Sequence, residues 1–390
     1  MAHRLNLISM PAGREPFSLL AVDRAVSELR RGLMVVIRGL GGNGALALAA
    51  EAVTPRTLAT FAEIAGDPAE LVITARRARA LGLAAGPGKA MALSAISDGG
   101  PGGPGKNTCL TAERIHGLID PLSRSGIEGL SCHETTEHGW CSAAVGLAKI
   151  ARLLPAAVTA GAGLNENDDL AAWAARRDLM LVDSGDVFQY EHTAARTLNA
   201  VSEARVPLLA AEDTRIIAFR PSDGGLEHLA IVIGEPKPGK PVLARLHSEC
   251  FTGDLLGSLR CDCGDQLKGA IAEIAAAGSG VLLYLAQEGR GIGLVNKLRA
   301  YTLQDNGFDT LDANEQLGFD ADERIYLPAA RMLRHLGFTT VRLMTNNPHK
   351  VTALAALGIT VAERVAHRFP SNRHNEAYLE TKKIRGGHLF

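Results

Sequence analysis

Residues 281–301, VLLYLAQEGRGIGLVNKLRAY, join an apolar run, a glycine-rich polar loop and the beginning of a helical pattern. The run at 281–285 is typical of a buried strand, and the pattern after it predicts a helix over about 293–306. Loop amides and helix N-termini attract anions, and Arg290 lies at this junction. The stretch therefore predicts a strand, loop and helix unit that suits a phosphorylated ligand.

Two further segments have the same design, NEQLGFDADERIYLPAARML at 314–333 and VRLMTNNPHKVTALAALG at 341–358. Each is expected to run from an apolar strand through a tight polar loop into a helix, and Lys350 lies at the second of these junctions. In the first, Asp322 and Arg324 are expected at a helix start, where they could serve as a general base and as a phosphoryl-binding cation. Ordinary turns and a solvated capping cluster are the alternatives.

Three of the six cysteines lie close together in HSECFTGDLLGSLRCDCG, residues 247–264. In an extended segment Cys261 and Cys263 would point the same way, and the residues between allow Cys250 to loop back to them. Three thiolates suit Zn²⁺ and leave one position for a water that the metal acidifies. Two alternatives stay open: incidental thiols, and a structural site that His247 completes.

The overall charge indicates no polyanionic partner, because 41 lysines and arginines against 42 acidic residues give a formal net charge of −1. The N-terminus lacks an apolar core of signal-peptide length, and no run of about 18 apolar residues occurs. Six cysteines in 390 residues do not make a disulfide scaffold. We therefore expect a cytoplasmic protein with no nucleic-acid or membrane partner.

The length allows two domains, and we place the division near residue 203. Strands and helices alternate through residues 1–203, which predicts an α/β domain of layered sheet and helices. Over residues 204–390 they alternate less regularly, which predicts an α+β domain with a mixed sheet. Residues 190–206 are expected to form a helical connector between the two.

A second glycine-rich stretch, LMVVIRGLGGNGALALAA at 33–50, has the G-x-G-x-x-G spacing of a dinucleotide-binding loop. It lies between an expected strand and an expected alanine-rich helix. The next strand, in LVITARRARA, is followed by arginines where that motif requires an acidic residue, so we reject dinucleotide binding. CHETTEH, at 132–138, spaces its histidines five apart and is not a zinc-protease helix.

A series of motifs runs from about residue 206 to the C-terminus: RLHSEC, TGD, SLRCDCG, QEGRGIGL, NKLRAY, DANEQLGF, DER, LMTNNPHK, NEAYLETK and GHL. Together they resemble the signature of the GTP cyclohydrolase II family. Two departures are small: LAQEGRGIGL lacks a basic residue that often precedes its glutamine, and VPLLAAED replaces the usual L-P-T-x-x-G opening. Neither removes a residue to which the resemblance assigns a role.

The resemblance implies a set of site residues. The zinc ligands would be Cys250, Cys261 and Cys263, one ion per chain, and the GTP contacts would be Arg245, Leu246, His247, Ser248, Glu249, Gln266, Glu288, Gly289, Arg290, Thr310, Thr345 and Lys350. Asp322 would accept a proton, and Arg324 would be the nucleophile toward the α-phosphorus. Tyr301 matches a tyrosine that the family uses to open the imidazole ring.

The implied reaction converts GTP and water into 2,5-diamino-6-ribosylamino-4(3H)-pyrimidinone 5′-phosphate, the first step of riboflavin synthesis. Zinc-activated water opens the guanine at carbon 8 and formate leaves, while the triphosphate loses pyrophosphate with Mg²⁺ assisting. This chemistry agrees with the residues, because a formamide hydrolysis needs an activated water and a polyanion needs local cations. The resemblance also implies a homodimer.

The first half more faintly resembles 3,4-dihydroxy-2-butanone 4-phosphate synthase, in AVSELRRGLMVVI, LAAEAVTP, ARRARALGL, NTCLTAERIHGLID and SAAVGLAKIARLL. Its acidic D-R-E-N-E-G-D loop is replaced by residues 39–45, which puts Gly41 at a metal-binding glutamate. Its G-H-T-E-A reads GWCSA, with Trp140 where the metal-ligand histidine would be. A Mg²⁺ site cannot survive both losses, so we predict a degenerate domain without synthase activity.

Two other functions stay open. One is a bifunctional enzyme that also makes 3,4-dihydroxy-2-butanone 4-phosphate from ribulose 5-phosphate. The other is a GTP-binding regulator that has lost catalysis, which the presence of all three clustered cysteines, Asp322 and Arg324 disfavours. Cys109, Cys132 and Cys141 are scattered and receive no role.

Overall fold

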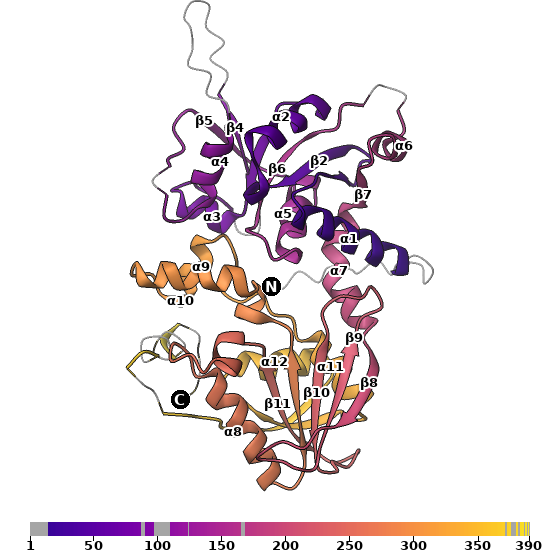
Figure 1. Ribbon diagram of the computed structural model, residues 1–390, viewed down its shortest axis with the longest axis vertical. Coiled ribbons are helices and arrows are strands. Elements are labelled where there is room, and N and C mark those ends of the chain that lie inside the picture. Colours follow the sequence, from indigo (N-terminus) through magenta and orange to yellow (C-terminus); the bar gives the residue numbers. More distant parts are fainter. Residues whose placement is uncertain are drawn as a thin grey trace, which may run out of the picture.

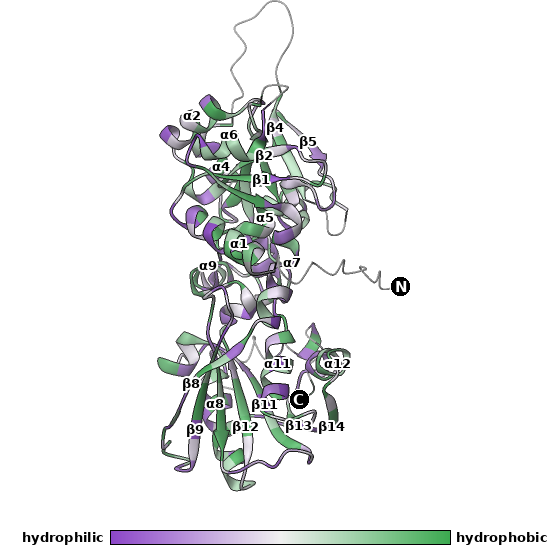
Figure 2. Cartoon of the chain, turned by 90° about the vertical axis from the view of Figure 1, so that its right-hand side faces the viewer, coloured by the Kyte–Doolittle hydropathy of each residue, from purple (hydrophilic) through white to green (hydrophobic). Residues whose placement is uncertain are grey.

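The computed structural model describes residues 15–86, 90–96, 110–123, 125–164, 168–370, 373–375, 380, 383–385, 387 and 389. Within them the chain forms two seven-stranded sheets, one from each half of the sequence. The sheets lie one beyond the other along the long axis of the molecule, with helices packed on each (Figure 1). Green apolar segments are concentrated on the strands of both sheets and the helix sides that cover them (Figure 2).

The first sheet has the strand order β5-β4-β3-β6-β2-β1-β7, and every described pair in it is antiparallel except β1 with β7. Its strands are β1 (Val35–Arg38), β2 (Gly44–Ala49), β3 (Glu70–Ile73), β4 (Met91–Ala95), β5 (Leu130–Glu134), β6 (Ala156–Gly161) and β7 (Met180–Asp183). The predicted layered α/β domain is confirmed, although the helices do not link parallel strands.

Helices cover both faces of this sheet. They are α1 (Glu15–Arg30), α2 (Pro55–Ile64), α3 (Ala75–Ala80), α4 (Ala112–Ile119), α5 (Trp140–Ile150), α6 (Leu170–Ala175) and α7 (Ser184–Arg196), with a short 3₁₀ turn at Ala50–Ala52. Side chains of a strand alternate between faces. Accordingly Val35 and Ile37 pack in the core with α1, α5 and α7, whereas Val36 packs in the core with α2, α3, α4 and α6.

The prediction of a helix after the glycine-rich loop at 39–43 is wrong. Residues 44–49 form β2, which pairs antiparallel with β1, and the amide of Gly39 donates to the carbonyl of Asn43 across the turn at 2.8 Å. All six residues of β2 are buried, and a short apolar run cannot distinguish a buried strand from a helix. The loop is therefore a hairpin turn without a helix N-terminus, which independently excludes a dinucleotide site.

The second sheet has the order β14-β13-β11-β12-β10-β9-β8. Its strands are β8 (Asn199–Arg205), β9 (Thr214–Arg220), β10 (His228–Ile233), β11 (Val242–Ser248), β12 (Gly280–Leu285), β13 (Thr340–Met344) and β14 (Thr360–Val365). The four from β14 to β12 run parallel and the remaining pairs are antiparallel, which confirms the predicted mixed sheet. Helix α8 (Cys263–Ala276) covers one face, and α11 (Leu327–His335) and α12 (Pro348–Ala356) cover the other.

Three local predictions in this half are wrong. Residues 199–205 are the edge strand β8 instead of a helical connector, because pairing with β9 outweighs a polar local sequence that lies wholly exposed. The segment 314–333 contains no strand, and helix α10 (Thr310–Gln316) overlaps its start. Helix α11 begins only at Leu327, so Asp322 and Arg324 lie in irregular chain before it.

The division near residue 203 stays a proposal, and the pairing of β8 with β9 assigns the whole of β8 to the second sheet.

Helices α9 (Leu294–Asp305) and α10 follow the second sheet in sequence but pack against the first domain (Figure 1). Ala300, Leu303, Ala313 and their neighbours Leu317 and Phe319 belong to the same buried cluster as the side chains under α2, α3 and α4. Polar contacts reinforce this packing, since the Thr74 hydroxyl donates to the carbonyl of Gly318 at 2.7 Å. Two helices of the second half are thus part of the core of the first.

Among the described residues there is no helix with the length and apolar character needed to cross a lipid bilayer.

We predict that Arg77→Met lowers the free energy of unfolding by about 3 kcal/mol, because Arg77 is 4% exposed and donates to three carbonyls, those of Leu118, Asp120 and Gln316. Methionine keeps the length but leaves these acceptors unsatisfied. Urea denaturation followed by circular dichroism measures the change. Arg79→Met, at an exposed position on the same helix, is the control, and we expect a change within about 0.5 kcal/mol. Equal losses in the two variants would contradict the prediction.

Candidate functional site

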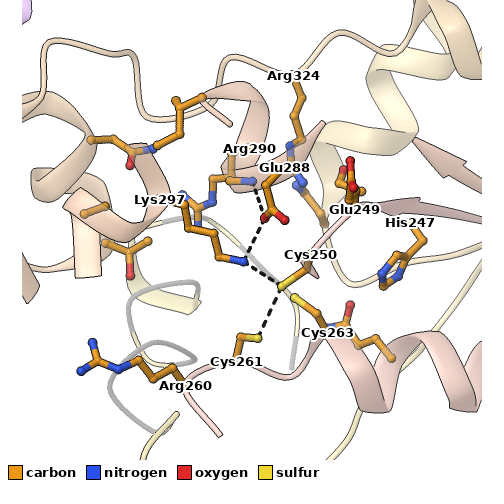
Figure 3. A pocket seen from close by; sticks show the side chains of 18 of the residues that line it. His247, Glu249, Cys250, Arg260, Cys261, Cys263, Glu288, Arg290, Lys297 and Arg324 are labelled. Atoms are coloured by element: carbon orange, nitrogen blue, oxygen red, sulfur yellow. Dashed lines mark hydrogen bonds and ion pairs between the residues drawn. The ribbon is translucent and has the colours of Figure 1, made fainter. Parts of the chain in front are cut away.

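A pocket lies at the carboxyl ends of the parallel strands β11, β12 and β13, the place where open α/β sheets bind ligands. The loops that follow these strands supply most of its wall, and α9 and α10 close it from the side of the first domain. The cavity volume is about 150 Å³. Cys250, Cys261 and Cys263 lie toward one end, and Arg290 and Arg324 lie toward the other (Figure 3).

The three cysteines of the sequence cluster meet at one point, with their sulfurs within 4.8 Å of one another. Cys250 follows β11 and Cys263 is the first residue of α8, so the expected extended arrangement of Cys261 and Cys263 is wrong although their proximity is confirmed. Between Cys250 and Cys261 the chain makes a π-helical turn, Phe251–Leu255. Gly253 is essential to this approach, because a Cβ there would lie 2.7 Å from the Cys261 sulfur and 3.0 Å from that of Cys250.

The geometry of these thiols fits a zinc ion. Two sulfurs bound to one tetrahedral zinc at about 2.3 Å lie about 3.8 Å apart, and the Cys250 and Cys261 sulfurs are 3.7 Å apart. Hydrogen bonds from Cys261 and Cys263 lower the pKa of the Cys250 thiol, while the bond to Cys250 raises the pKa of Cys261 to about 11. The trio therefore holds negative charge at Cys250, and a soft divalent cation is the ion that such a donor set prefers.

His247 does not join the cysteine group. Its Nε2 lies 3.0 Å from a carboxylate oxygen of Asp254, and its ring stacks on Tyr284 at 5.5 Å. Asp254 also accepts hydrogen bonds from the Cys250 amide and the Tyr284 hydroxyl. The alternative of a structural site completed by His247 thus finds no support among the described residues, and Asp254 emerges as the carboxylate that holds the Cys250 loop.

Lys297 and Glu288 connect the cysteines to the rest of the pocket. The Lys297 ammonium donates to the Cys250 sulfur at 3.0 Å, to the Thr252 hydroxyl and to Glu288. Glu288 is 3% exposed, and its other oxygen accepts from the Phe251 amide at 2.6 Å. The pair fixes the metal end of the pocket to the loop after β12.

Tyr301 lies one helical turn beyond Lys297 on α9, as the NKLRAY spacing requires. Its hydroxyl is 3.3 Å from that of Thr252, and burial raises its pKa. The Arg260 guanidinium lies over its ring, 5.1 Å from the centroid. Tyr301 is therefore a neutral hydroxyl beside the cysteine turn.

Besides Lys297 and Arg260, four further cations line the pocket: Arg245, Arg290, Arg324 and Lys350. Arg245 and Lys350 are almost fully buried; Arg245 donates to the carbonyl of Met344 and Lys350 to that of Leu246. Arg290 has φ 64°, a left-handed conformation that aims its side chain from the tight turn after β12. Arg245 lies within β11 and Lys350 in the first turn of α12, and this set of cations suits a ligand with several negative charges.

Asp322 and Arg324 form a pair with 2.8 Å between a carboxylate oxygen and Nε. Burial would raise the pKa of Asp322, but the hydrogen bonds and charge of Arg324 outweigh it and the pKa is lowered. Arg324 lines the pocket, whereas Asp322 supports it from behind. Asp322 is thus an ionised carboxylate that orients Arg324.

The structure brings almost all the residues named from the sequence into one pocket. Those that line it are Arg245, His247, Ser248, Glu249, Cys250, Cys261, Cys263, Gln266, Glu288, Gly289, Arg290, Tyr301, Thr310, Arg324, Thr345 and Lys350. Two do not: Asp322, and Leu246, whose side chain lies in the core. Lining residues that sequence reasoning missed are Arg260, Ile292, Lys297, Ala300, Gln304, Asn314, Asn346 and Asn347, several of them inside motifs already singled out.

Comparison with known proteins agrees with this geometry. The GTP cyclohydrolase II family matches residues 199–366. A GTP cyclohydrolase-2 of Azospirillum brasilense is 55% identical over 376 residues, which cover 96% of this chain and 94% of that protein. The chain belongs to the GTP cyclohydrolase II family.

Other relatives of this family member differ in how much of the chain they match. A GTP cyclohydrolase-2 of Azotobacter vinelandii is 61% identical over 166 residues, which cover 43% of this chain and 80% of that protein. A riboflavin biosynthesis protein, RibBA, of Phocaeicola vulgatus is 35% identical and covers 96% of this chain and 99% of its own length. The family therefore includes relatives with and without a counterpart of the first domain.

Solved structures give weaker likenesses. A two-domain 3,4-dihydroxy-2-butanone 4-phosphate synthase from A. baumannii has a TM-score of 0.37 and 19% identity, covering 90% of this chain and 99% of that one. The synthase of Candida albicans has a TM-score of 0.35 and 18% identity, covering 44% of this chain and 96% of that one.

The residues at the expected synthase site make no metal cluster. The Trp140 ring packs on the loop at 39–43, 3.2 Å from where a Cβ on Gly39 would be. His133 lies 4.0 Å from Glu70 at the surface, and the His138 ring lies tilted against that of Phe188, with 5.1 Å between the centroids. Of the residues that the structure describes, only the three clustered cysteines form a metal-capable group of this kind. Cys132 and Cys141 are free thiols, and Cys109 lies outside the described residues.

We predict that Gly253→Ala weakens zinc binding by at least about tenfold, because the new methyl group collides with two of the three sulfurs. Zinc content after dialysis against a chelator measures this, and circular dichroism checks that the fold is kept. Gly185→Ala is the matched control, since a Cβ at Gly185 meets nothing within 4 Å. Full zinc occupancy in Gly253→Ala would show that the turn does not set the site.

Proposed function

We propose that the protein is a zinc-dependent GTP cyclohydrolase II that converts GTP into 2,5-diamino-6-ribosylamino-4(3H)-pyrimidinone 5′-phosphate, formate and pyrophosphate, in riboflavin biosynthesis. The observation that carries the proposal is one pocket that brings together three metal-capable thiols and four cations, Arg245, Arg290, Arg324 and Lys350. Hydrolysis of the guanine ring needs a metal that activates water, which the thiols can bind, and a bound triphosphate needs cations to balance its charge. Membership of the GTP cyclohydrolase II family supports the same reaction.

At the metal end, Cys250, Cys261 and Cys263 would hold zinc, which when bound supplies a Lewis acid that activates water. The chain's own residues arrange the rest. Lys297 offsets the negative charge of Cys250 at 3.0 Å, and Glu288 holds Lys297. We assign to Tyr301 a role in opening the imidazole ring, because its neutral hydroxyl lies beside the cysteine turn and can donate or accept a hydrogen bond there.

At the phosphate end, Arg290, Arg324, Arg245 and Lys350 would bind the triphosphate, with Mg²⁺ sharing its charge. We keep Arg324 as the nucleophile toward the α-phosphorus and Asp322 as the proton acceptor. Their 2.8 Å contact supports this division, because the guanidinium nitrogen would become acidic as it bonds to phosphorus and pyrophosphate leaves. Its proton would then pass to the carboxylate that already accepts its hydrogen bond. The remaining proposed GTP contacts are His247, Ser248, Glu249, Gln266, Gly289, Thr310, Thr345 and, through its backbone, Leu246.

We also propose that the enzyme is a cytoplasmic homodimer. Large apolar side chains are exposed on two neighbouring segments, Phe251, Leu255, Leu256 and Leu259 beside the cysteines, and Val295 and Leu298 on α9. Thr252 and Arg260 contact Tyr301, which joins these segments into one apolar surface that a second copy could cover. Three reduced thiols within one site suit a reducing compartment.

We predict that the protein, with Zn²⁺ and Mg²⁺, releases one formate and one pyrophosphate per GTP, and that Cys261→Ser lowers formate release by at least about 100-fold because the metal site loses a soft ligand. Cys132→Ser, which removes a thiol far from the pocket, should keep full activity. Product analysis by chromatography and enzymatic formate assay measures both. GTP binding without either product would contradict the proposal and favour a regulator.

We propose further that the first domain has no synthase activity, because Gly41 offers no oxygen donor and Trp140 fills the place of an imidazole. With ribulose 5-phosphate and Mg²⁺ we predict formate release no faster than in the absence of protein. An authentic synthase assayed in parallel is the positive control. Enzyme-dependent formate from this substrate would instead establish a bifunctional enzyme.

A further inference from the structure

We infer that Arg152, a residue of the first domain, is a positioning residue for the pocket of the second. Its side chain and backbone attach the segment 286–296, which carries Glu288, Gly289 and Arg290 and leads into Lys297 and Tyr301. Arg152 does not itself line the pocket. The effect on catalysis rests on the proposed function, whereas the effect on the segment does not.

The first attachment holds the beginning of the segment. The Arg152 Nη2 donates to the carbonyl of Ala286 at 2.7 Å, and the amide of Ala286 donates to His228 Nδ1 at 3.0 Å. Ala286 comes directly after β12, where the sheet's own hydrogen bonds end. The peptide groups at the exit of this strand are therefore held by one side chain from each domain.

The second and third attachments hold the end of the segment. Gly293, with φ +86°, packs so closely on the Arg152 stem that a Cβ there would be 3.0 Å from its Cδ. Asn296 is fully buried, and its side-chain amide donates at 3.0 Å both to the carbonyl of Arg152 and to that of Ile292. Arg152 thus contacts the N-terminus of α9 through its stem and its backbone together.

The chain between these attachments is held in an unfavourable backbone conformation. Gly289 and Arg290 both have φ 64°, and Gly291 has φ +101°, so three successive residues are left-handed. For arginine this conformation is unfavourable and persists only where the surroundings impose it. Within the loop the Gly293 amide donates to the carbonyl of Glu288 at 2.9 Å, and the Glu323 amide donates to that of Arg290 at 3.1 Å. The attachments to Arg152 hold both ends, so that the strained loop keeps Glu288 and Arg290 in the wall of the pocket.

Arg152 is itself preorganised for this contact. It follows α5 with φ 58°, again left-handed, which turns the chain so that stem, carbonyl and guanidinium all face the second domain. Nearby, Glu51 accepts from the Leu154 amide and pairs with Arg299 of α9 at 2.9 Å. Arg152 occupies the position after the C-cap of α5, where the Leu153 amide donates to the carbonyl of Ala148 at 3.0 Å. Glycine is the usual residue there, so arginine holds this position at a cost in backbone energy.

The test compares Arg152→Asn and Arg152→Lys with the unchanged protein. Asparagine tolerates the left-handed backbone but is too short to reach Ala286, whereas lysine keeps a long stem and one donor. We expect amide hydrogen exchange in peptides covering 286–297 to accelerate at least about tenfold in Arg152→Asn, with exchange elsewhere unchanged. We expect kcat/KM for GTP to fall about 10- to 100-fold, and Arg152→Lys to restore part of both.

Arg76→Gln is the matched control. Arg76 also bridges the domains, through Glu315 and Asp320, but touches nothing in 286–296. We expect it to leave exchange in 286–297 unchanged and kcat/KM within about twofold of the unchanged protein. Unaltered exchange in Arg152→Asn, or an equal acceleration in Arg76→Gln, would overturn the inference. Absence of GTP turnover in the unchanged protein would refute the proposed function alone, because the exchange measurement still decides the role of Arg152.

Discussion

The burial of α9 and α10 against the first domain is the constraint on which the pocket depends. Ala300 and Leu303 are part of a core that also contains side chains of α2, α3 and α4, so this wall of the pocket cannot move without opening that core. Lys297 and Tyr301 are carried on the same helix and face the cysteines. The position of two pocket side chains is thus set by apolar packing in a domain that does not line the pocket.

The three cysteines lie in a tightly packed end of the pocket. Gly253 brings three sulfurs together because any larger residue would separate them, and Asp254, beside it, holds the Cys250 amide and His247. Lys297 then supplies the positive charge that a group of thiols needs. The Gly253 backbone leaves space for the three sulfurs, the Asp254 carboxylate holds the Cys250 loop, and the Lys297 ammonium balances the negative charge of the thiols.

If the first domain lacks synthase activity, as proposed above, it illustrates how fold and function separate. Its sheet, its helices and its two cores are intact, while the loop at 39–43 is a plain hairpin turn and Trp140 packs against it. What the domain keeps is its surface toward the second domain, through Thr74, Arg77 and Arg152. The first domain can therefore determine the shape of the pocket without contributing a described lining residue to it.

By itself the sequence predicted a layered α/β first half and a mixed sheet in the second, because the alternation of apolar segments is a local pattern. Its motifs, through their resemblance to a known family, also named most of the residues that meet in the pocket. Prediction from the sequence failed where pairing with a distant segment decides the local structure. The apolar run at 44–49 is a strand because it pairs with β1, and the exposed residues 199–205 are a strand because they pair with β9. Only the tertiary structure showed that Lys297 contacts Cys250 and that Arg152 contacts Ala286. Contacts between residues far apart in the sequence produce no periodic pattern from which they could be predicted.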